Sequence, residues 1–115
     1  MVRVYGISNC DTVKKAKTWL IENKIDFTFH DYKKLGISSE KLSYWCEQMG
    51  WEQVLNKNGL TYKKLSEAEK HGICNQDTAM AYMLKATSSI KRPIIETSKG
   101  LLVGFLPDAY QNMFG

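Results

Sequence analysis

The first part of the chain shows, in order, the patterns of a strand, a helix and a second strand. Residues 2–7 form a β-branched and aromatic run, which predicts a strand. Over residues 11–23 the apolar positions recur mostly at three- and four-residue spacing, which predicts an amphipathic helix. Residues 25–32 then place apolar side chains largely on alternate positions, which predicts a second strand that reaches Tyr32. A strand, a helix and a strand in close succession predict a βαβ unit with parallel strands.

The middle of the chain, residues 36–89, carries helical patterns throughout. A helix that starts after Ser38 or Ser39 has one apolar face, formed by Leu42, Trp45, Cys46 and Met49. A capping-box pattern that begins at Ser66 predicts a second, short helix. A third helix after Asn75 has its own apolar face, formed by Ala79, Met80, Met83 and Leu84.

Strand patterns return after Pro93. Residues 94–95 are separated by a turn signal at Lys99-Gly100 from a second apolar run, residues 101–105. Two short runs across a turn predict an antiparallel hairpin. Pro107 then suits the first turn of a closing helix.

Taken in order, these elements predict an α/β protein. A βαβ half, an all-helical segment and a ββα half are the arrangement of a thioredoxin-like fold with an all-helical insertion between its two halves. We therefore expect one domain over residues 1–115, in which residues 1–34 and 90–115 form the thioredoxin core and residues 35–89 form the insertion. Such a fold does not by itself determine function.

Composition and charge narrow the class of protein. The 115 residues are 43% hydrophobic and 24% charged, which is ordinary for a soluble globular domain. No export signal is visible at the N-terminus, and the longest apolar run, residues 101–106, is too short to cross a bilayer. The formal net charge of +4 comes from scattered lysine pairs, whereas nucleic-acid binding usually needs a denser basic patch. We expect a cytoplasmic monomer with no membrane or direct nucleic-acid partner, compatible with a small anionic ligand.

Cys10 is the strongest candidate for chemistry. It falls at the junction of the first strand and the first helix, where unpaired N–H groups and the helix dipole favour an anion such as a thiolate. Nearby Lys14 or a distant arginine would lower the pKa of this thiol further. Position alone leaves two interpretations open, a nucleophile or a buried structural cysteine.

The two other cysteines are predicted to play different parts. An odd number of widely spaced cysteines does not indicate a disulfide framework. Cys46 lies on an apolar helix face and is predicted to be a core residue. Cys74 is a candidate resolving thiol. His71 and Cys74 have no second ligand pair, so no metal site is expected, and His30 is not predicted to be catalytic.

Arg92-Pro93 stands just before a predicted strand. The guanidinium of Arg92 is a planar, permanently charged fork that suits a carboxylate or an oxyanion, although a plain surface arginine is the alternative. Proline lacks an N–H, which leaves the preceding backbone free to pair with an incoming thiol-containing peptide.

Residues 5–16, YGISNCDTVKKA, resemble the opening of the ArsC family, and most closely its YffB branch. Further segments that resemble the family are residues 29–32, 50–51, 55–59, 91–93 and 104–105. The resemblance implies a thioredoxin fold with a helical insert and a nucleophilic cysteine at Cys10. It also implies a cis proline at Pro93 and an arginine, Arg92, that faces the cysteine.

The departures from the family pattern matter as much as the matches. Arsenate reductases of the family surround the nucleophile with three arginines, whereas this chain keeps only Arg92 and has Asn56 and approximately Gly104 at the other places. A single guanidinium leaves most of the charge of a multiply charged oxyanion unpaired. Spx regulators often have Cys-x-x-Cys, but here Val13 takes the second position, so the site is monothiol.

We therefore expect an oxidoreductase with Cys10 as nucleophile and glutathione as co-substrate, through a mixed disulfide. The residues expected to bind substrate are Arg92, Pro93, Asn9 and Lys14. No tightly bound cofactor is expected, and glutaredoxin is a candidate partner. Two alternatives stay open, a glutathione- and glutaredoxin-dependent arsenate reductase and a non-enzymatic, Spx-like regulator that binds RNA polymerase.

Overall fold

The structure is a computed structural model that describes residues 2–115. It contains one four-stranded sheet, with strands in the order β2-β1-β3-β4. The strands are β1 (Val2–Gly6), β2 (Phe27–Asp31), β3 (Ile94–Thr97) and β4 (Gly100–Val103). β1 pairs with β2 in parallel, and the β1–β3 and β3–β4 pairs are antiparallel. The predicted α/β fold, with a βαβ and a ββα half, is confirmed.

The chain divides into two compact units. The sheet unit comprises the chain up to Leu35 and from Arg92 to Gly115, and the helical unit comprises Gly36–Lys91. The helices of the sheet unit are α1 (Asp11–Glu22), α2 (Tyr32–Leu35) and α8 (Pro107–Phe114).

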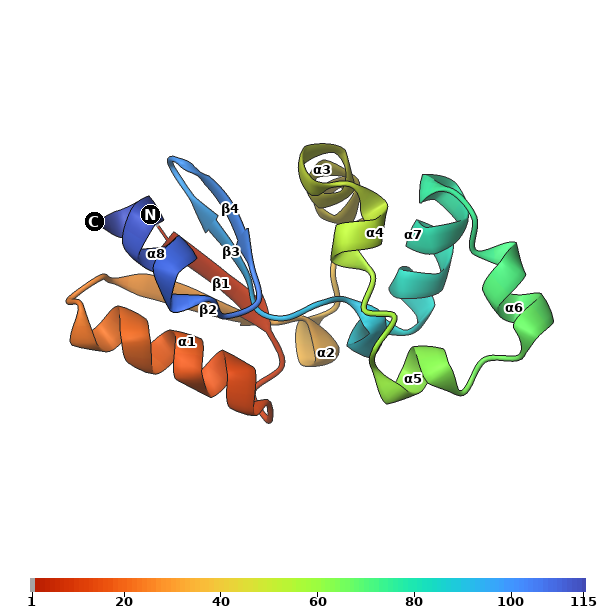
Figure 1. The fold of residues 1–115 in the computed structure, drawn as a ribbon, viewed down its shortest axis with the longest axis horizontal. Helices are drawn as coiled ribbons and strands as arrows, with labels where there is room; N and C mark the ends of the chain where they lie inside the picture. The colour runs from red at the N-terminus through yellow and green to blue at the C-terminus, as the bar shows by residue number, and fades with distance from the viewer. Residues whose placement is uncertain (1) are drawn as a thin grey trace. The chain divides into compact units, whose positions relative to one another are not determined.

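The core of the sheet unit lies between the sheet and the helices α1 and α8, which cover the same face (Figure 1). Its buried side chains come from three strands and both helices: Val4, Ala16, Leu20, Ile95, Leu102 and Tyr110. Trp19 of α1 meets Tyr110 of α8 edge to face, with ring centroids 5.4 Å apart, an arrangement that aromatic pairs favour. Burial of this apolar stripe fixes α1, and therefore its N-terminus, against the end of β1.

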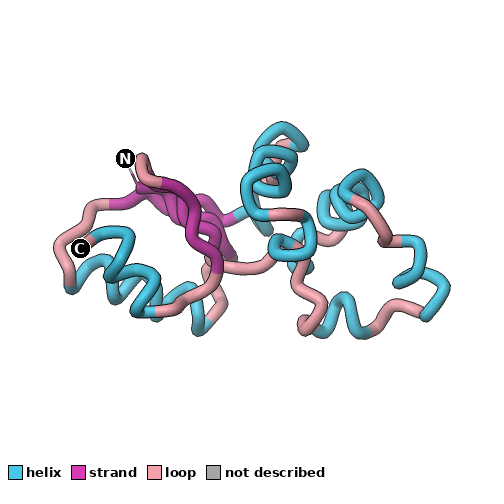
Figure 2. Tube along the Cα trace, turned by 45° about the horizontal axis from the view of Figure 1, so that its top comes forward, coloured by secondary structure: helices cyan, strands magenta, loops and turns pink. Residues whose placement is uncertain are grey.

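The helical unit consists of helices connected by loops (Figure 2). One isolated antiparallel bridge within it pairs Leu55 with Ile90. Its helices are α3 (Ser39–Met49), α4 (Trp51–Val54), α5 (Leu60–Lys63), α6 (Glu67–Gly72), α7 (Gln76–Lys85) and the 3₁₀ helix η1 (Thr87–Ser89). Ser38 caps α3, and both predicted helix starts at Ser66 and Asn75 are capping boxes. The predicted helical character of this segment is therefore confirmed.

The helical unit buries its own apolar residues. The fully or almost fully buried ones include Leu42, Trp45, Cys46, Val54, Leu55, Ala79, Met83 and Ile90. Leu84 was expected on the apolar face of α7 but is 38% exposed, because the buried stripe of this short helix consists of Ala79 and Met83.

Two predicted strand ends are wrong. The second strand stops at Asp31, and Tyr32 begins α2, because the Asp31 carboxylate accepts the N–H groups of Lys33 and Lys34 and so caps a helical turn. The last strand stops at Val103 because Gly104 adopts a left-handed φ of 74° that ends the extended run.

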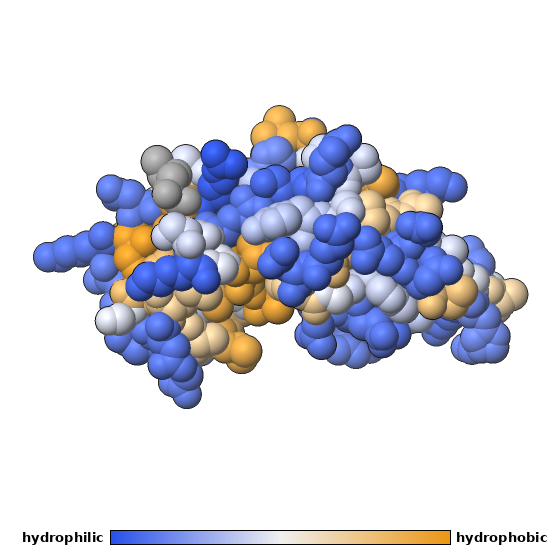
Figure 3. Space-filling view, turned by 90° about the horizontal axis from the view of Figure 1, so that it is seen from above, coloured by the Kyte–Doolittle hydropathy of each residue, from blue (hydrophilic) through white to orange (hydrophobic). Residues whose placement is uncertain are grey.

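The surface is mixed in character. The face in Figure 3 is largely hydrophilic, with separate apolar patches. Over residues 2–115, no helix combines the length and the apolar character needed to cross a membrane.

Candidate active site

The register of the sheet brings several segments to one edge. Gly6 at the end of β1 lies opposite Asp31 at the end of parallel β2. Because β3 runs antiparallel to β1, its first residue Ile94 lies opposite Tyr5. Ile94 in turn lies opposite Val103, the last residue of β4. The segment before α1, the start of α2, the segment before β3 and the end of β4 therefore meet at this edge.

Cys10 occupies the N-cap position of α1, with extended backbone angles of φ −147° and ψ 123°. Its backbone carbonyl accepts the N–H of Lys14 at 3.0 Å, the first bond of the helix. Cys10 as a whole residue is partly buried, between the buried and the exposed cysteines of the chain. The backbone N–H groups of Val13 and Thr12, in the first turn of α1, point toward the sulfur.

The surroundings of Cys10 favour its ionised form. Partial burial opposes ionisation, but it is outweighed by hydrogen bonds from the Val13 N–H, the Arg92 side chain and the Thr12 N–H and by the charge of Arg92. Together these groups hold the pKa of the Cys10 thiol below its ordinary value. Since a thiolate is the nucleophilic form of cysteine, the site is suited to attack on an electrophilic sulfur or similar centre.

Arg92 connects Cys10 with a buried phenol. Its side chain also hydrogen-bonds the hydroxyl of Tyr32, the first residue of α2, whose side chain is fully buried. Burial raises the pKa of Tyr32 despite the nearby positive charge, so the phenol is neutral at physiological pH. The guanidinium thus contacts both a neutral oxygen and the sulfur, and its positive charge favours the ionised form of the sulfur.

Pro93 lies directly before β3, at this edge of the sheet. It is buried, and the Arg92–Pro93 peptide bond is cis, as the family resemblance implied. The Pro93 carbonyl accepts the N–H of Gly104 at 2.8 Å, which ties the segment before β3 to the end of β4.

Asp31 and Tyr32 belong to the site, and sequence reasoning missed both as functional residues. The Asp31 carboxylate accepts the backbone N–H of Ser8, at 3.2 Å, from the segment that precedes Cys10. The available signal was their position at the carboxyl end of a strand predicted to run parallel to the first, because such ends share an edge of the sheet.

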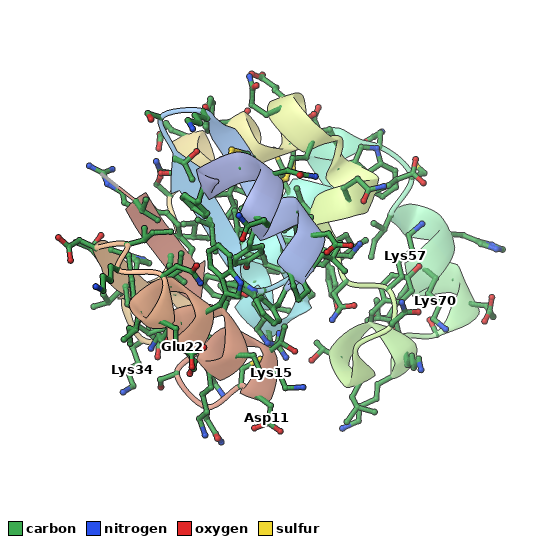
Figure 4. All side chains as sticks on the ribbon, turned by 60° about the vertical axis from the view of Figure 1, so that its left-hand side comes forward. Asp11, Lys15, Glu22, Lys34, Lys57 and Lys70 are labelled. Atoms are coloured by element: carbon green, nitrogen blue, oxygen red, sulfur yellow. The ribbon has the colours of Figure 1, made fainter. Side chains whose placement is uncertain are left out.

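Two predicted substrate-binding residues, Asn9 and Lys14, are exposed neighbours of Cys10 in the chain. Of the two groups expected to lower the pKa of Cys10, Lys14 or a distant arginine, the arginine, Arg92, does so together with the helix backbone. The exposed side chains of α1 include Asp11, Lys15 and Glu22, which Figure 4 labels.

The remaining cysteines lie in the helical unit. Cys46 is 2% exposed, which confirms it as a core residue, and burial together with the charge of Glu47 raises the pKa of its thiol to about 11. Cys74 is exposed, just before α7. Cys10 is therefore the one cysteine of the sheet unit. Among residues 2–115, no group of three or more His, Cys, Asp or Glu side chains gathers as a metal site would require.

Comparison with known proteins places this site in a family. The sequence profile described as the ArsC family matches residues 5–113. The chain belongs to the ArsC family. An uncharacterised protein of Haemophilus influenzae is 39% identical over 114 residues, 99% of each chain. A global transcriptional regulator, Spx, of Streptococcus pyogenes is 26% identical, covering 94% of this chain and 81% of the regulator.

Solved structures of the family share the fold. A structure of the YffB protein covers 100% of both chains at 47% identity, with a TM-score of 0.94. The solution structure of a protein related to arsenate reductase, from Brucella melitensis, is 44% identical, with a TM-score of 0.78, and covers 98% of this chain and 93% of that one. The resemblance seen in the sequence to the ArsC family and its YffB branch is confirmed.

Asn56 and Gly104, which the sequence resemblance placed where arginines were expected, have local structural roles here. Asn56 accepts the N–H of Asn58 through its side-chain oxygen and so shapes a turn of the helical unit. Gly104 has a φ of 74°, which an arginine would adopt only with strain.

Proposed function

We propose that this chain is a monothiol reductase that exchanges disulfides with glutathione. The Cys10 thiolate attacks the glutathione sulfur of a glutathionylated thiol, forms a Cys10–glutathione disulfide and releases the other sulfur as a thiolate, which takes up a proton. The thiolate of a second glutathione then attacks the mixed disulfide, so that Cys10 leaves as a thiolate and oxidised glutathione is formed. Atoms and electrons balance with glutathione as the reductant.

The observation that carries this proposal is the contact between Cys10 and Arg92 at the start of α1. A helix N-terminus and a guanidinium both stabilise an anion, and Cys10, which contacts both, is only partly buried. Val13 replaces a second cysteine at the usual spacing of a dithiol motif, so we assign resolution of the mixed disulfide to a second glutathione, with Cys74 as the alternative resolving thiol.

Glutathione supplies two carboxylates, and one guanidinium suits one of them. We assign Arg92 and the backbone beside Pro93 to the tripeptide, with the exposed side chains of Asn9 and Lys14 as further contacts. Action as a monomer in the cytoplasm, without a tightly bound cofactor and with glutaredoxin as a candidate partner, remains a prediction.

The test is the formation of the Cys10–glutathione adduct. The wild-type chain, incubated with oxidised glutathione at neutral pH, should gain one glutathione on the peptide that contains Cys10, as measured by mass spectrometry. Cys10→Ser should lose this adduct, whereas the matched control Cys74→Ser should keep it. An equal amount of adduct on the Cys10→Ser chain would reject Cys10 as the nucleophile.

A regulatory function is the second candidate, because the similarity to Spx covers 94% of this chain. In that case the chain would bind RNA polymerase rather than catalyse a reaction. Stoichiometric capture of purified RNA polymerase that survives Cys10→Ser would favour binding, and failure to capture it would remove this candidate.

Arsenate reduction is the third candidate, suggested by the relation of the Brucella melitensis protein to arsenate reductase. We rank it below thiol exchange because a single guanidinium, that of Arg92, contacts the sulfur. Arsenite production that depends on glutathione and glutaredoxin would restore it, and its absence would leave thiol exchange as the enzymatic function.

A further inference from the structure

The segment that carries Cys10 is short and partly exposed. Between the end of β1 at Gly6 and the start of α1 at Asp11, only Ile7 is buried, and Ser8 and Asn9 are exposed. Apolar burial therefore anchors one residue of this loop, and the position of the sulfur depends on polar contacts as well.

One side chain supplies such contacts. Asp31, 8% exposed, accepts the backbone N–H of Ser8 at 3.2 Å through Oδ2. Through Oδ1 it accepts the N–H groups of Lys33, at 3.0 Å, and Lys34, at 3.2 Å, in the first turn of α2. The Ser8 hydroxyl lies near the carboxylate and helps to stabilise its negative charge. One carboxylate thus joins the loop before Cys10 to the helix that begins with Tyr32.

We infer that Asp31 is a positioning residue for Cys10: by joining the loop before α1 to the first turn of α2, its carboxylate holds the sulfur against the start of α1 and beside Arg92. This inference rests on the proposed function in that it takes Cys10 as the reacting residue. It adds a residue that touches neither substrate nor sulfur and acts through the backbone.

The hydrogen bonds of Asp31 keep it ionised. Burial opposes its charge, but the backbone N–H groups of Ser8, Lys34 and Lys33 and the Ser8 hydroxyl outweigh burial and hold the pKa of the carboxyl below its ordinary value. An ionised carboxylate accepts all these bonds at neutral pH, whereas an amide at the same position has only one acceptor atom.

The charge of Asp31 and its positioning role have opposite effects on Cys10. The groups that face the sulfur are Arg92 before β3 and Tyr32 on α2, and on α1 itself Asp11 and Lys14 are exposed. A nearby negative charge raises the pKa of a thiol, so neutralising Asp31 without moving the loop would favour the thiolate. Releasing the loop would instead weaken the contacts with Val13, Thr12 and Arg92 and disfavour the thiolate.

Because loss of the charge and release of the loop would shift the pKa of Cys10 in opposite directions, the variant Asp31→Asn distinguishes the two effects. The rate of alkylation of Cys10 by iodoacetamide is measured against pH on the full chain, by mass spectrometry of the Cys10 peptide. We expect the profile of Asp31→Asn to move to higher pH, with a several-fold loss of rate at neutral pH. Asp26→Asn, which removes an equal charge from an exposed residue before β2, should keep the wild-type profile.

An unchanged profile, or one that moves to lower pH, would overturn the inference. Should Asp31→Asn fail to fold by circular dichroism, Ser8→Ala decides, because it removes only the hydroxyl contact. It should move the profile in the same direction by a smaller amount, and an unchanged profile would again overturn the inference. If the wild-type chain forms no glutathione adduct while Asp31→Asn still slows alkylation, the proposed function fails and the positioning role stands.

Discussion

At the scale of single residues, Arg92 combines a geometric and an electrostatic role. It hydrogen-bonds both the Cys10 sulfur and the Tyr32 hydroxyl, which fixes the guanidinium between them. A hydrogen bond to an ionised partner is roughly twice as strong as one between neutral groups, so this contact strengthens when the thiol loses its proton. Arg92 is therefore a determinant of the thiolate population.

Replacing Arg92 tests this role through pH. Arg92→Gln removes the charge and the fork, so the pKa of Cys10 should rise and the thiolate fraction at neutral pH should fall. Iodoacetamide alkylation should then be several-fold slower at neutral pH and recover as the pH is raised. The chain has one other arginine, the exposed Arg3 on β1, and Arg3→Gln is the matched control. Equal profiles for the two variants would contradict the role.

A site residue could be predicted from the sequence when its role depends on its neighbours in the chain, but not when it depends on distant segments. Cys10 follows a strand and precedes a helix in the sequence itself, so its N-cap position could be predicted. Asp31 and Tyr32 act on segments far away in the chain, and their contacts require the parallel register that places Gly6 opposite Asp31. The contact of Arg92 with Cys10 came from family resemblance, because position alone could not distinguish it from a surface arginine.

At the scale of elements, α1 and β1 lie very close together where Val13 of α1 meets Gly6 of β1. A Cβ added at Gly6 would lie 2.8 Å from a methyl carbon of Val13, a fully buried residue of α1. Real Cβ atoms do not approach so closely, and the branched Val13 side chain has little rotamer freedom in a helix. Gly6 thus sets how near the first turn of α1 lies to the sheet.

We expect Gly6→Ala to destabilise the fold by about 1–3 kcal/mol, the usual cost of overpacking a core. Since the displaced turn carries the Val13 N–H, alkylation of Cys10 should also slow. Urea denaturation and the alkylation rate measure the two effects. Gly72→Ala is the control, because an added Cβ there meets no atom within 4 Å. Wild-type stability in Gly6→Ala would show that α1 adjusts freely.

The elements that the sequence pattern revealed are those long enough to show a period. α1, α3 and α7 each span several turns and could be predicted, whereas α2, α4 and α5 have four residues each, too few for a helical repeat to be visible. Strand ends were uncertain for a different reason. β2 and β4 end where a helix cap or a left-handed glycine intervenes, and both depend on backbone geometry.

At the scale of the whole molecule, stability should be distributed unevenly. β1 and β3 are the central strands of the sheet, each paired on both sides, and they carry the fully buried Val4 and Ile95. In contrast, α5 and α6 contain no buried residue. Local opening is easiest where few apolar contacts must break.

Hydrogen exchange followed by mass spectrometry or NMR measures this distribution. The amides of β1 and β3 should exchange slowest, because opening them requires loss of the sheet core. The amides of α5 and α6 should exchange fastest among the helices. Equal protection of α5 and β1 would contradict the expected order.

The order of the strands along the chain determines which strand pairs can form first during synthesis. The central strand β1 leaves the ribosome before its neighbour β3, because β3 and the adjoining Arg92 follow only after the whole helical unit. A nascent chain can form the parallel β1–β2 pair early, since that contact is local, whereas the β1–β3 pair has a high sequence separation and forms late. Cys10 therefore acquires its guanidinium partner only after the helical unit has been synthesised, and until then its thiol lacks this contribution to its nucleophilicity.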